Sequence, residues 1–249
     1  MELLASLKES LLDLVYPRPG YCLYCQENEL RPGQFKICEE CLLEIDYITE
    51  GYCQKCGKLL AEVEVEEQLC ADCEDQNYKF SRARAAATYA SIGDYIYQLK
   101  YEKKQALAQP LGEILGVCAV QFYNPRDLDL IIPVPVSAKK LKKRGFNQAN
   151  LLAQEVAKKL DLEVNNEVLK RAVDTVSQSK LSLAERKENV KDIFYCEPKQ
   201  VKEIKEQTLL LVDDIYTTGS TANECAKVLL RAGAAEVKVL TLATGRQEN

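Results

Sequence analysis

The stretch LLLVDDIYTTGST at residues 209–221 decides the fold. Residues 209–212 are apolar throughout, which is typical of a central strand in a parallel sheet. Two acids, Asp213 and Asp214, follow directly, and a polar turn then leads into a helix that we predict at residues 220–232. Because α/β proteins bind ligands where parallel strands end, the acids and the turn mark a candidate site.

The turn has the chemistry of a phosphate site. The start of a helix carries free N–H groups and the positive end of the helix dipole, and both attract an anion. Gly219 lets the backbone approach a ligand closely. Hydroxyl donors surround it at Thr217, Thr218, Ser220 and Thr221. The adjacent carboxylates can accept hydrogen bonds from sugar hydroxyls, so the stretch favours a sugar phosphate over an ordinary strand–helix turn with a Ser/Thr cap.

Strand-like and helix-like segments alternate after residue 80, which indicates a parallel α/β sheet with right-handed crossovers. The further strands are predicted at 83–90, 128–134 and 237–243, and the further helices at 94–100, 105–120 and 148–160. Cysteines, acids and turn residues fill the chain before that point. We therefore predict two domains, residues 1–79 and residues 80–249, with a short amphipathic helix near the start of the first.

A dense run of cations follows the strand predicted at 128–134. Five cations occur within six residues: Lys139, Lys140, Lys142, Lys143 and Arg144. A turn with cations at the start of a helix suits a diphosphate. A solvated basic surface is the alternative. Arg144, beside Gly145, is the preferred ligand because it lies nearest the start of the helix predicted at 148–160.

The chain contains eleven cysteines, and eight of them form four Cys-x-x-Cys pairs before residue 74. The pairs repeat as two sets: Cys22, Cys25, Cys38 and Cys41, then Cys53, Cys56, Cys70 and Cys73. Each set supplies four thiolates for a tetrahedral zinc ion with no open position, so we predict two structural zinc ions. Sequential pairing follows from the repeat, but crossed pairing also satisfies the spacing. Disulfides or redox pairs are the weaker alternatives.

Composition narrows the function further. The chain has no histidine, which excludes a histidine general base and a Ser-His or Cys-His dyad. Residues 15–79 hold six Lys/Arg and fourteen Asp/Glu, whereas residues 80–249 hold 26 and 21, so the first region is acidic and the second mildly basic. A polyanion is expected to meet the second region. With neither a membrane-spanning apolar run nor a signal peptide, we expect a cytoplasmic protein.

These motifs together resemble the ComF family of competence-associated, phosphoribosyltransferase-like proteins, over nearly the full chain. The resemblance rests on LKY at 99–101, RGFNQ at 144–148, the TxxQxxL pattern at 175–181 with Arg186 and Asn189, and VDDxxTTG at 212–219. It implies a type I phosphoribosyltransferase fold with an N-terminal double zinc ribbon. It also implies phosphoribosyl diphosphate as ligand and a role in natural transformation, in the handling of incoming single-stranded DNA.

The resemblance also implies roles for single residues. Asp213 and Asp214 would be the catalytic acids that bind the ribose hydroxyls, and Thr217, Thr218, Gly219, Ser220 and Thr221 would hold the 5-phosphate. Lys100, Arg144 and Gly145 would bind the diphosphate, which Mg²⁺ accompanies. The segment 175–189 would be a flexible loop that closes over the ligand, with Arg186 near the diphosphate and Gln178 near the acceptor.

Three functions follow from this resemblance. The first is a phosphoribosyltransferase with an unidentified acceptor. The second is glutamine-dependent amidophosphoribosyl transfer, which we do not expect because Glu2 follows Met1 where that class has a cysteine, and because the glutamine-hydrolysing domain is missing. The third is a non-catalytic adaptor that senses phosphoribosyl diphosphate and docks a helicase-like competence protein through its zinc module.

Overall fold

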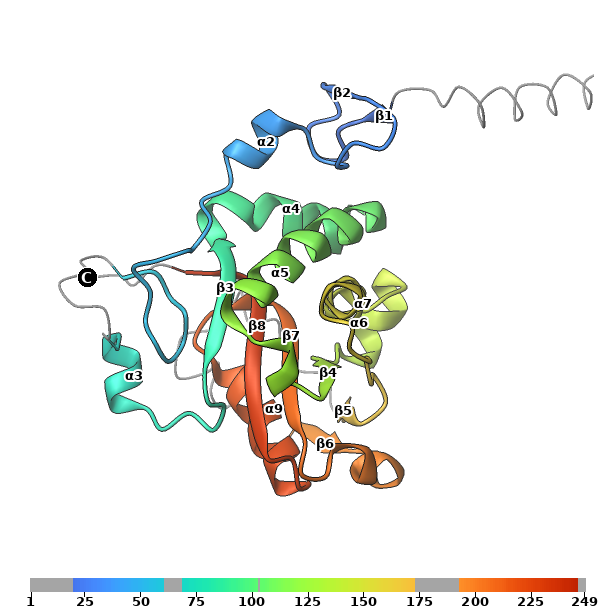
Figure 1. Ribbon diagram of the computed structural model, residues 1–249. Coiled ribbons are helices and arrows are strands. Elements are labelled where there is room, and N and C mark those ends of the chain that lie inside the picture. Colours follow the sequence, from blue (N-terminus) through green and yellow to red (C-terminus); the bar gives the residue numbers. More distant parts are fainter. Residues whose placement is uncertain (1–19, 61–68, 103, 173–192, 246–249) are drawn as a thin grey trace, which may run out of the picture. The chain divides into compact units, whose positions relative to one another are not determined.

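The computed structural model describes residues 20–60, 69–102, 104–172 and 193–245 (Figure 1). The chain forms two compact units, one ending at Glu44 and the other beginning at Ile45. These bodies do not coincide with the sequence domains 1–79 and 80–249, and that division stays a prediction. The amphipathic helix predicted near the start of the chain lies outside the described residues. Among those described, no helix has the length and apolar character needed to cross a membrane.

The first unit is small and built around its cysteines. Strands β1 (Gly20–Tyr21) and β2 (Glu29–Leu30) pair antiparallel, and helix α2 (Glu39–Leu43) follows them. Cys22 and Cys25 follow β1, whereas Cys38 caps α2 and Cys41 lies within it. Because these few regular elements enclose little apolar core, a bound metal is the expected source of stability.

The second unit contains the predicted parallel sheet, which is confirmed. Four strands lie in the order β3 (Ala83–Thr88), β8 (Glu236–Thr244), β7 (Thr208–Tyr216) and β4 (Leu130–Pro133), and every pair is parallel (Figure 1). Pro133 lies in the edge strand β4, where its missing N–H costs no central hydrogen bond. The register aligns Val212 with Pro133 and Asp213 with Thr241. The carboxyl end of β7 therefore extends beyond the end of β4, and its last residues pair with β8 alone.

Helices cover both faces of this sheet. On one face α5 (Ala108–Phe122) and α7 (Gln148–Leu160) pack against each other and against the strands, and α9 (Ser220–Arg231) covers the other. Successive strand side chains point to opposite faces, so Leu209 and Leu211 join the cluster under α9. The same alternation directs Asp213 toward the α9 face and Asp214 toward the α7 face.

The second four-cysteine module is part of the second unit. It includes Cys53 and Cys56, followed by helix α3 (Ala71–Asp75), and its buried cysteines belong to the same apolar cluster as the α9 face of the sheet. Gly57 has φ +74°, and a Cβ there would lie 2.7 Å from the carbonyl oxygen of Ala83. This close approach docks the module on the first residue of β3.

Several elements differ from the sequence prediction. The first strand ends at Thr88, and helix α4 (Tyr89–Tyr101) starts at the next residue. The Thr88 hydroxyl lies 3.2 Å from Asp46 Oδ2 and 3.2 Å from Ser91 Oγ at this junction. The cationic run, predicted in a turn before the next helix, itself forms helix α6 (Ala138–Arg144). The short elements completing the unit are η1 (Gln105–Leu107), η2 (Pro125–Asp127), β5 (Leu169–Arg171), β6 (Phe194–Cys196) and η4 (Pro198–Ile204).

Candidate phosphoribosyl and metal sites

The structure gathers the eight paired cysteines into two sets in sequence order. Each set has its four sulfur atoms within 4.8 Å of one another. The repeat is structural as well as sequential, because Cys38 N donates to Cys22 Sγ at 3.3 Å and Cys70 N donates to Cys53 Sγ at 3.3 Å. Four thiolates about 2.3 Å from one zinc ion lie about 3.8 Å apart. The chemistry and spacing of both sets therefore fit structural zinc.

The turn that we predict to bind phosphate, residues 217–221 and called the phosphate turn below, runs from the end of β7 into the start of α9. Gly219 adopts φ +75° as the cap of α9, and a Cβ there would collide with the ring of Tyr216. The hydroxyls of Thr218 and Ser220 lie 2.8 Å apart, and Ser220 N donates to Thr218 Oγ1 at 3.3 Å. The backbone thus reaches the left-handed region that only glycine adopts freely, and helix α9 begins at the next residue.

The two acids have different partners. Asp214 forms an ion pair with Lys100 of α4 and accepts from Gln148 Nε2 of α7 at 3.4 Å. Asp213 accepts from the backbone N–H of Asp214 at 2.8 Å. Lys100 and Gln148 thus bring α4 and α7 onto the carboxylate that points to their face of the sheet.

These partners separate the pKa values of the acids. Burial raises the pKa of Asp213 well above its ordinary value, and the neighbouring Asp214 charge raises it further. Burial alone would also raise the pKa of Asp214, but the Lys100 ammonium and the hydrogen bonds from Asp213 and Gln148 outweigh it and lower that pKa. Asp213 therefore holds its proton more tightly than an ordinary carboxyl does, and Asp214 holds its proton less tightly.

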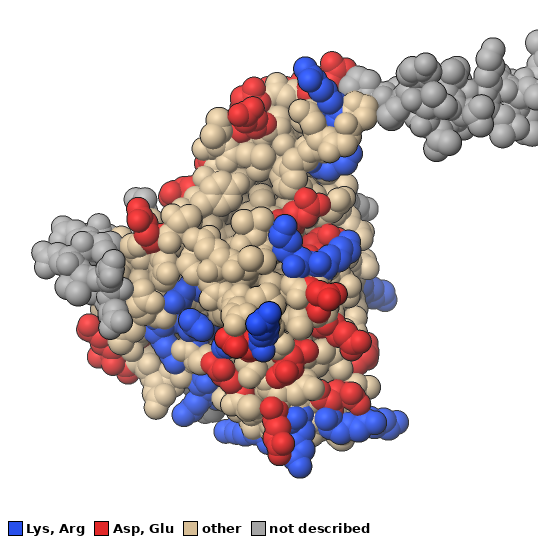
Figure 2. Space-filling view, viewed as in Figure 1, with Lys and Arg blue, Asp and Glu red and all other residues tan. Residues whose placement is uncertain are grey.

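Cations converge on the same end of the sheet. Burial lowers the pKa of the Lys140 ammonium, and the charges of Arg171, Lys100 and Arg144 lower it further. The Arg144 guanidinium donates to Gln148 and lies 5.4 Å from the ring centroid of Tyr101. Like charges gathered in this way favour an anion between them. On the face shown in Figure 2, by contrast, acidic and basic side chains are interspersed.

Sequence reasoning missed two members of this cluster. Arg171 ends the three-residue strand β5, and no motif surrounds it in the sequence. Tyr101 lies next to Lys100 but meets Arg144 only through the fold. Gly145 has φ +89° and ends α6 immediately beside Arg144. The predicted loop residues Gln178 and Arg186 lie outside the described residues, so their roles stay predictions.

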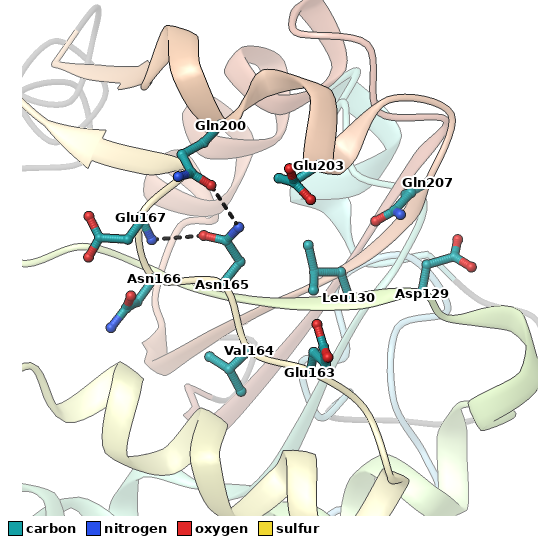
Figure 3. A pocket seen from close by; sticks show the side chains of 10 residues that line it. All are labelled: Asp129, Leu130, Glu163, Val164, Asn165, Asn166, Glu167, Gln200, Glu203 and Gln207. Carbon is teal, nitrogen blue, oxygen red and sulfur yellow. Dashed lines mark hydrogen bonds between the residues drawn. The ribbon is translucent and has the colours of Figure 1, made fainter.

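A polar pocket of about 370 Å³ lies at the other end of the strands (Figure 3). It is lined by Leu130 at the start of β4 and by Asp129, Asn165, Gln200 and Gln207 among others. Asp129 accepts from Thr208 N at 2.7 Å, and Asn165 Nδ2 donates to Gln200 Oε1 at 3.4 Å. Because it opens at the amino ends of the strands, this pocket is separate from the acids and the phosphate turn.

Comparison with known proteins supports both halves of this description. Residues 11–76 match the family profile described as double zinc ribbon domain, and residues 141–249 match the phosphoribosyl transferase domain. Competence protein F of Haemophilus influenzae is 30% identical over 226 residues, covering 89% of this chain and 96% of that protein. DNA utilization protein YhgH of Escherichia coli (strain K12) is 31% identical over 228 residues, covering 90% and 96%. Competence protein ComFC of Bacillus subtilis (strain 168) is 27% identical over 220 residues, covering 86% and 85%.

Proposed function

The chain belongs to the ComF family of competence proteins, and from this premise we propose that it binds phosphoribosyl diphosphate at the carboxyl end of β7. One observation carries the proposal. The acids that would accept the ribose hydroxyls, the hydroxyl-rich turn at the start of α9 and a cluster of four cations meet at one end of one sheet. Together these groups suit the hydroxyls, the phosphate and the diphosphate of this ligand.

The phosphate turn would receive the 5-phosphate. Thr218 and Ser220 supply hydroxyls, and the start of α9 adds the positive end of the helix dipole. Asp213 and Asp214 would then accept hydrogen bonds from the ribose hydroxyls. The ionised form of Asp214 suits this role best, because Lys100 already balances its charge.

The diphosphate would lie against Lys100, Lys140, Arg144 and Arg171, with Gly145 giving the backbone room to approach. Carboxylate oxygens such as those of Asp213 and Asp214 are the hard donors that Mg²⁺ prefers, so the site fits a magnesium ion carried with the ligand. That ion would neutralise part of the diphosphate charge. The cationic residues would stabilise the negative charge that develops on the leaving diphosphate.

Such a site can support transfer of the phosphoribosyl group. The bond from C1 of the sugar to the diphosphate oxygen breaks, the electron pair leaves with diphosphate, and an acceptor forms the new bond to C1. Positioning and charge stabilisation carry most of this reaction, so the absence of histidine is no obstacle.

Calorimetry with phosphoribosyl diphosphate and Mg²⁺ tests the binding proposal. We expect a 1:1 complex for the wild-type chain and a large loss of affinity for Asp213→Asn. Losing a charge-assisted hydrogen bond costs about 1.5–3 kcal/mol. Glu163→Gln is the matched control, since it removes one exposed acid at the other end of the sheet. Unchanged affinity in Asp213→Asn would refute the assignment. Release of diphosphate in the presence of candidate acceptors would separate an enzyme from a sensor.

A second candidate function is contact with single-stranded DNA, which a surface feature favours. The names of the relatives mention competence and DNA utilization. Tyr97 and Tyr101 are both exposed on α4, with ring centroids 5.1 Å apart. Arg144 packs on Tyr101, and the exposed Lys142 and Lys143 precede it in α6. Aromatic rings that stack bases, beside cations that bind phosphates, are the usual elements of a single-strand site.

Titration of labelled single-stranded DNA at two salt concentrations tests this candidate. Each phosphate contact adds about 0.7 to the logarithmic salt slope. Tyr101→Ala should weaken binding, whereas Tyr195→Ala, an exposed tyrosine on β6, should not. Phosphoribosyl diphosphate should compete, because Arg144 would serve both ligands. Salt-independent binding would exclude this surface.

The first four-cysteine module supports the adaptor hypothesis. It forms a compact unit of its own that ends at Glu44, and we propose that it docks a helicase-like competence protein. The cytosol is the proposed location, because eight cysteines kept as thiolates require a reducing compartment. Leu43 is 78% exposed, so Leu43→Asp would change the surface of this module. Docking would be supported if the partner co-purifies with the wild-type chain but not with Leu43→Asp.

A further inference from the structure

We propose that the second four-cysteine module supports the phosphate turn through Tyr78, so that metal in this module sets the affinity for the 5-phosphate. The inference rests on the proposed function and extends it. According to this inference, the second module does more than stabilise the fold. It also affects ligand binding. Tyr78 is a positioning residue here, because it contacts the backbone of the turn and not the ligand.

Two hydrogen bonds join the segment that follows the second module to the phosphate turn and to the start of α9. The Tyr78 hydroxyl donates to the carbonyl oxygen of Thr218 at 2.8 Å, across 140 residues of sequence. The next residue donates as well, from Lys79 N to Asn223 Oδ1 at 2.7 Å in the first turn of α9. The hydroxyl of Thr218 contacts that of Ser220. Tyr78 therefore holds the backbone of one predicted phosphate ligand and, through it, contacts the second indirectly.

An aromatic stack fills the space beneath these bonds. The rings of Tyr78 and Phe80 stack with centroids 5.0 Å apart, and Phe80 meets Tyr216 edge-on at 6.2 Å. All three side chains are buried. Tyr216 in turn fills the space beside Gly219, where a Cβ would collide with its ring. The turn therefore rests on a rigid apolar support rather than on solvent.

The module holds the same segment from its other side. Lys55 lies between Cys53 and Cys56, and its ammonium donates to the carbonyl oxygen of Phe80 at 2.6 Å. Ala83 N donates to the carbonyl oxygen of Lys55 at 2.8 Å. The segment 78–80 thus contacts two turns. One is the phosphate turn, and the other is the turn around Lys55, whose shape depends on the predicted metal ligands Cys53 and Cys56.

Loss of metal from the second module should weaken phosphate binding, because the metal supplies most of the folding free energy of this module. A structural zinc site supplies the free energy that orders a region this small. When the four thiolates of the second module are not held together, Lys55 and Tyr78 lose their fixed positions. The phosphate donors of the turn then have to be ordered by the ligand itself, which lowers its affinity.

Calorimetry with two separate probes tests this inference on the full chain. Ribose 5-phosphate reports on the phosphate turn, and inorganic diphosphate with Mg²⁺ reports on the cation cluster. Tyr78→Phe should weaken ribose 5-phosphate binding by roughly five- to tenfold, the effect of one hydrogen bond, and leave diphosphate binding unchanged. Tyr123→Phe is the matched control, because this buried hydroxyl donates to the carbonyl oxygen of Val239 at 2.7 Å, in the middle of β8. It should change neither affinity.

Selective loss of metal gives the second measurement. Cys53→Ala should lower both the zinc content and the affinity for ribose 5-phosphate, whereas Cys22→Ala should lower the zinc content alone. If the wild-type chain binds ribose 5-phosphate and Tyr78→Phe binds it equally tightly, the inference is wrong but the proposed function still stands. Equal loss of both probes in Tyr78→Phe would also overturn it, since that is a general loss of fold. Failure of the wild-type chain to bind either probe would overturn the proposed function and the inference together.

Discussion

Replacing the two acids one at a time should move stability in opposite directions. Asp214 is 7% exposed and pairs with Lys100, which is 15% exposed. Asp214→Asn leaves the Lys100 ammonium nearly buried with a neutral partner. Asp213→Asn instead removes a carboxyl whose pKa is raised, and so removes the cost of ionising it inside the folded chain. The two changes are chemically identical and adjacent, so each is the control for the other.

The size of the first effect follows from the burial of the pair. Breaking a buried ion pair costs about 3–5 kcal/mol, and the partial exposure of Lys100 favours the lower end. For a chain of this length, each 1 kcal/mol lowers Tm by about 2–4 °C, so Asp214→Asn should lose about 6–12 °C. Asp213→Asn should melt at or above the wild-type temperature at neutral pH.

The pH dependence gives the same prediction a second form. A raised carboxyl pKa means that the folded state binds the proton more tightly than the unfolded chain. Its contribution is present below the ordinary carboxyl pKa and is lost as the pH rises through the raised value. Asp213→Asn should remove that loss. The lowered pKa of Asp214 gives stability above the ordinary value, which is lost as the pH falls through the lowered one. Asp214→Asn should remove this gain.

Scanning calorimetry of the unliganded wild type and both variants, at several pH values between 4 and 8, measures these effects. Circular dichroism at low temperature establishes that each variant is folded before heating. A melting temperature for Asp214→Asn equal to that of the wild type would refute the assigned ion pair. Equal destabilisation by both substitutions would refute the asymmetry between the two acids.

Three further predictions concern other parts of the site. Elemental analysis of freshly purified protein should find two zinc ions per chain, and a chain without zinc would contradict both four-cysteine sites. Gly219→Ala should lower stability by about 1–2 kcal/mol from backbone strain alone, and should also weaken ribose 5-phosphate binding in the same calorimetric assay; retained affinity would argue against the phosphate turn. Arg171→Ala should weaken inorganic diphosphate binding by about 1.5–3 kcal/mol, whereas Arg126→Ala should not, and equal affinities would remove Arg171 from the site.

Much of the fold could be predicted because its signals are local. The apolar run before Asp213 requires a buried strand, and the polar turn that ends at Gly219 requires a helix start, so β7 and α9 follow from adjacent residues. The cysteine spacing likewise predicts the two four-sulfur sets, because a Cys-x-x-Cys turn presents both sulfurs by itself. Sequential rather than crossed pairing needed the structure.

The remaining features depend on contacts between distant segments. Helix α6 is not predicted, because the cationic run is expected in a turn before the next helix, although Ser137 caps the start of α6 and Gly145 ends it in the left-handed region. Arg171 and Tyr78 have no motif around them, and only the fold brings one to Lys140 and the other to Thr218. Sequence patterns can show which residues are chemically suited to a site, but not which distant side chains support it.

A crystal structure of the full chain with phosphoribosyl diphosphate and Mg²⁺ tests the central claim most directly. We predict density for the 5-phosphate in the turn of Thr217, Thr218, Gly219, Ser220 and Thr221. The ribose hydroxyls should contact Asp213 and Asp214, and the diphosphate should lie between Lys140 and Arg144. Density for the ligand in the polar pocket at the amino ends of the strands, or at any place away from the carboxyl end of β7, would contradict the account.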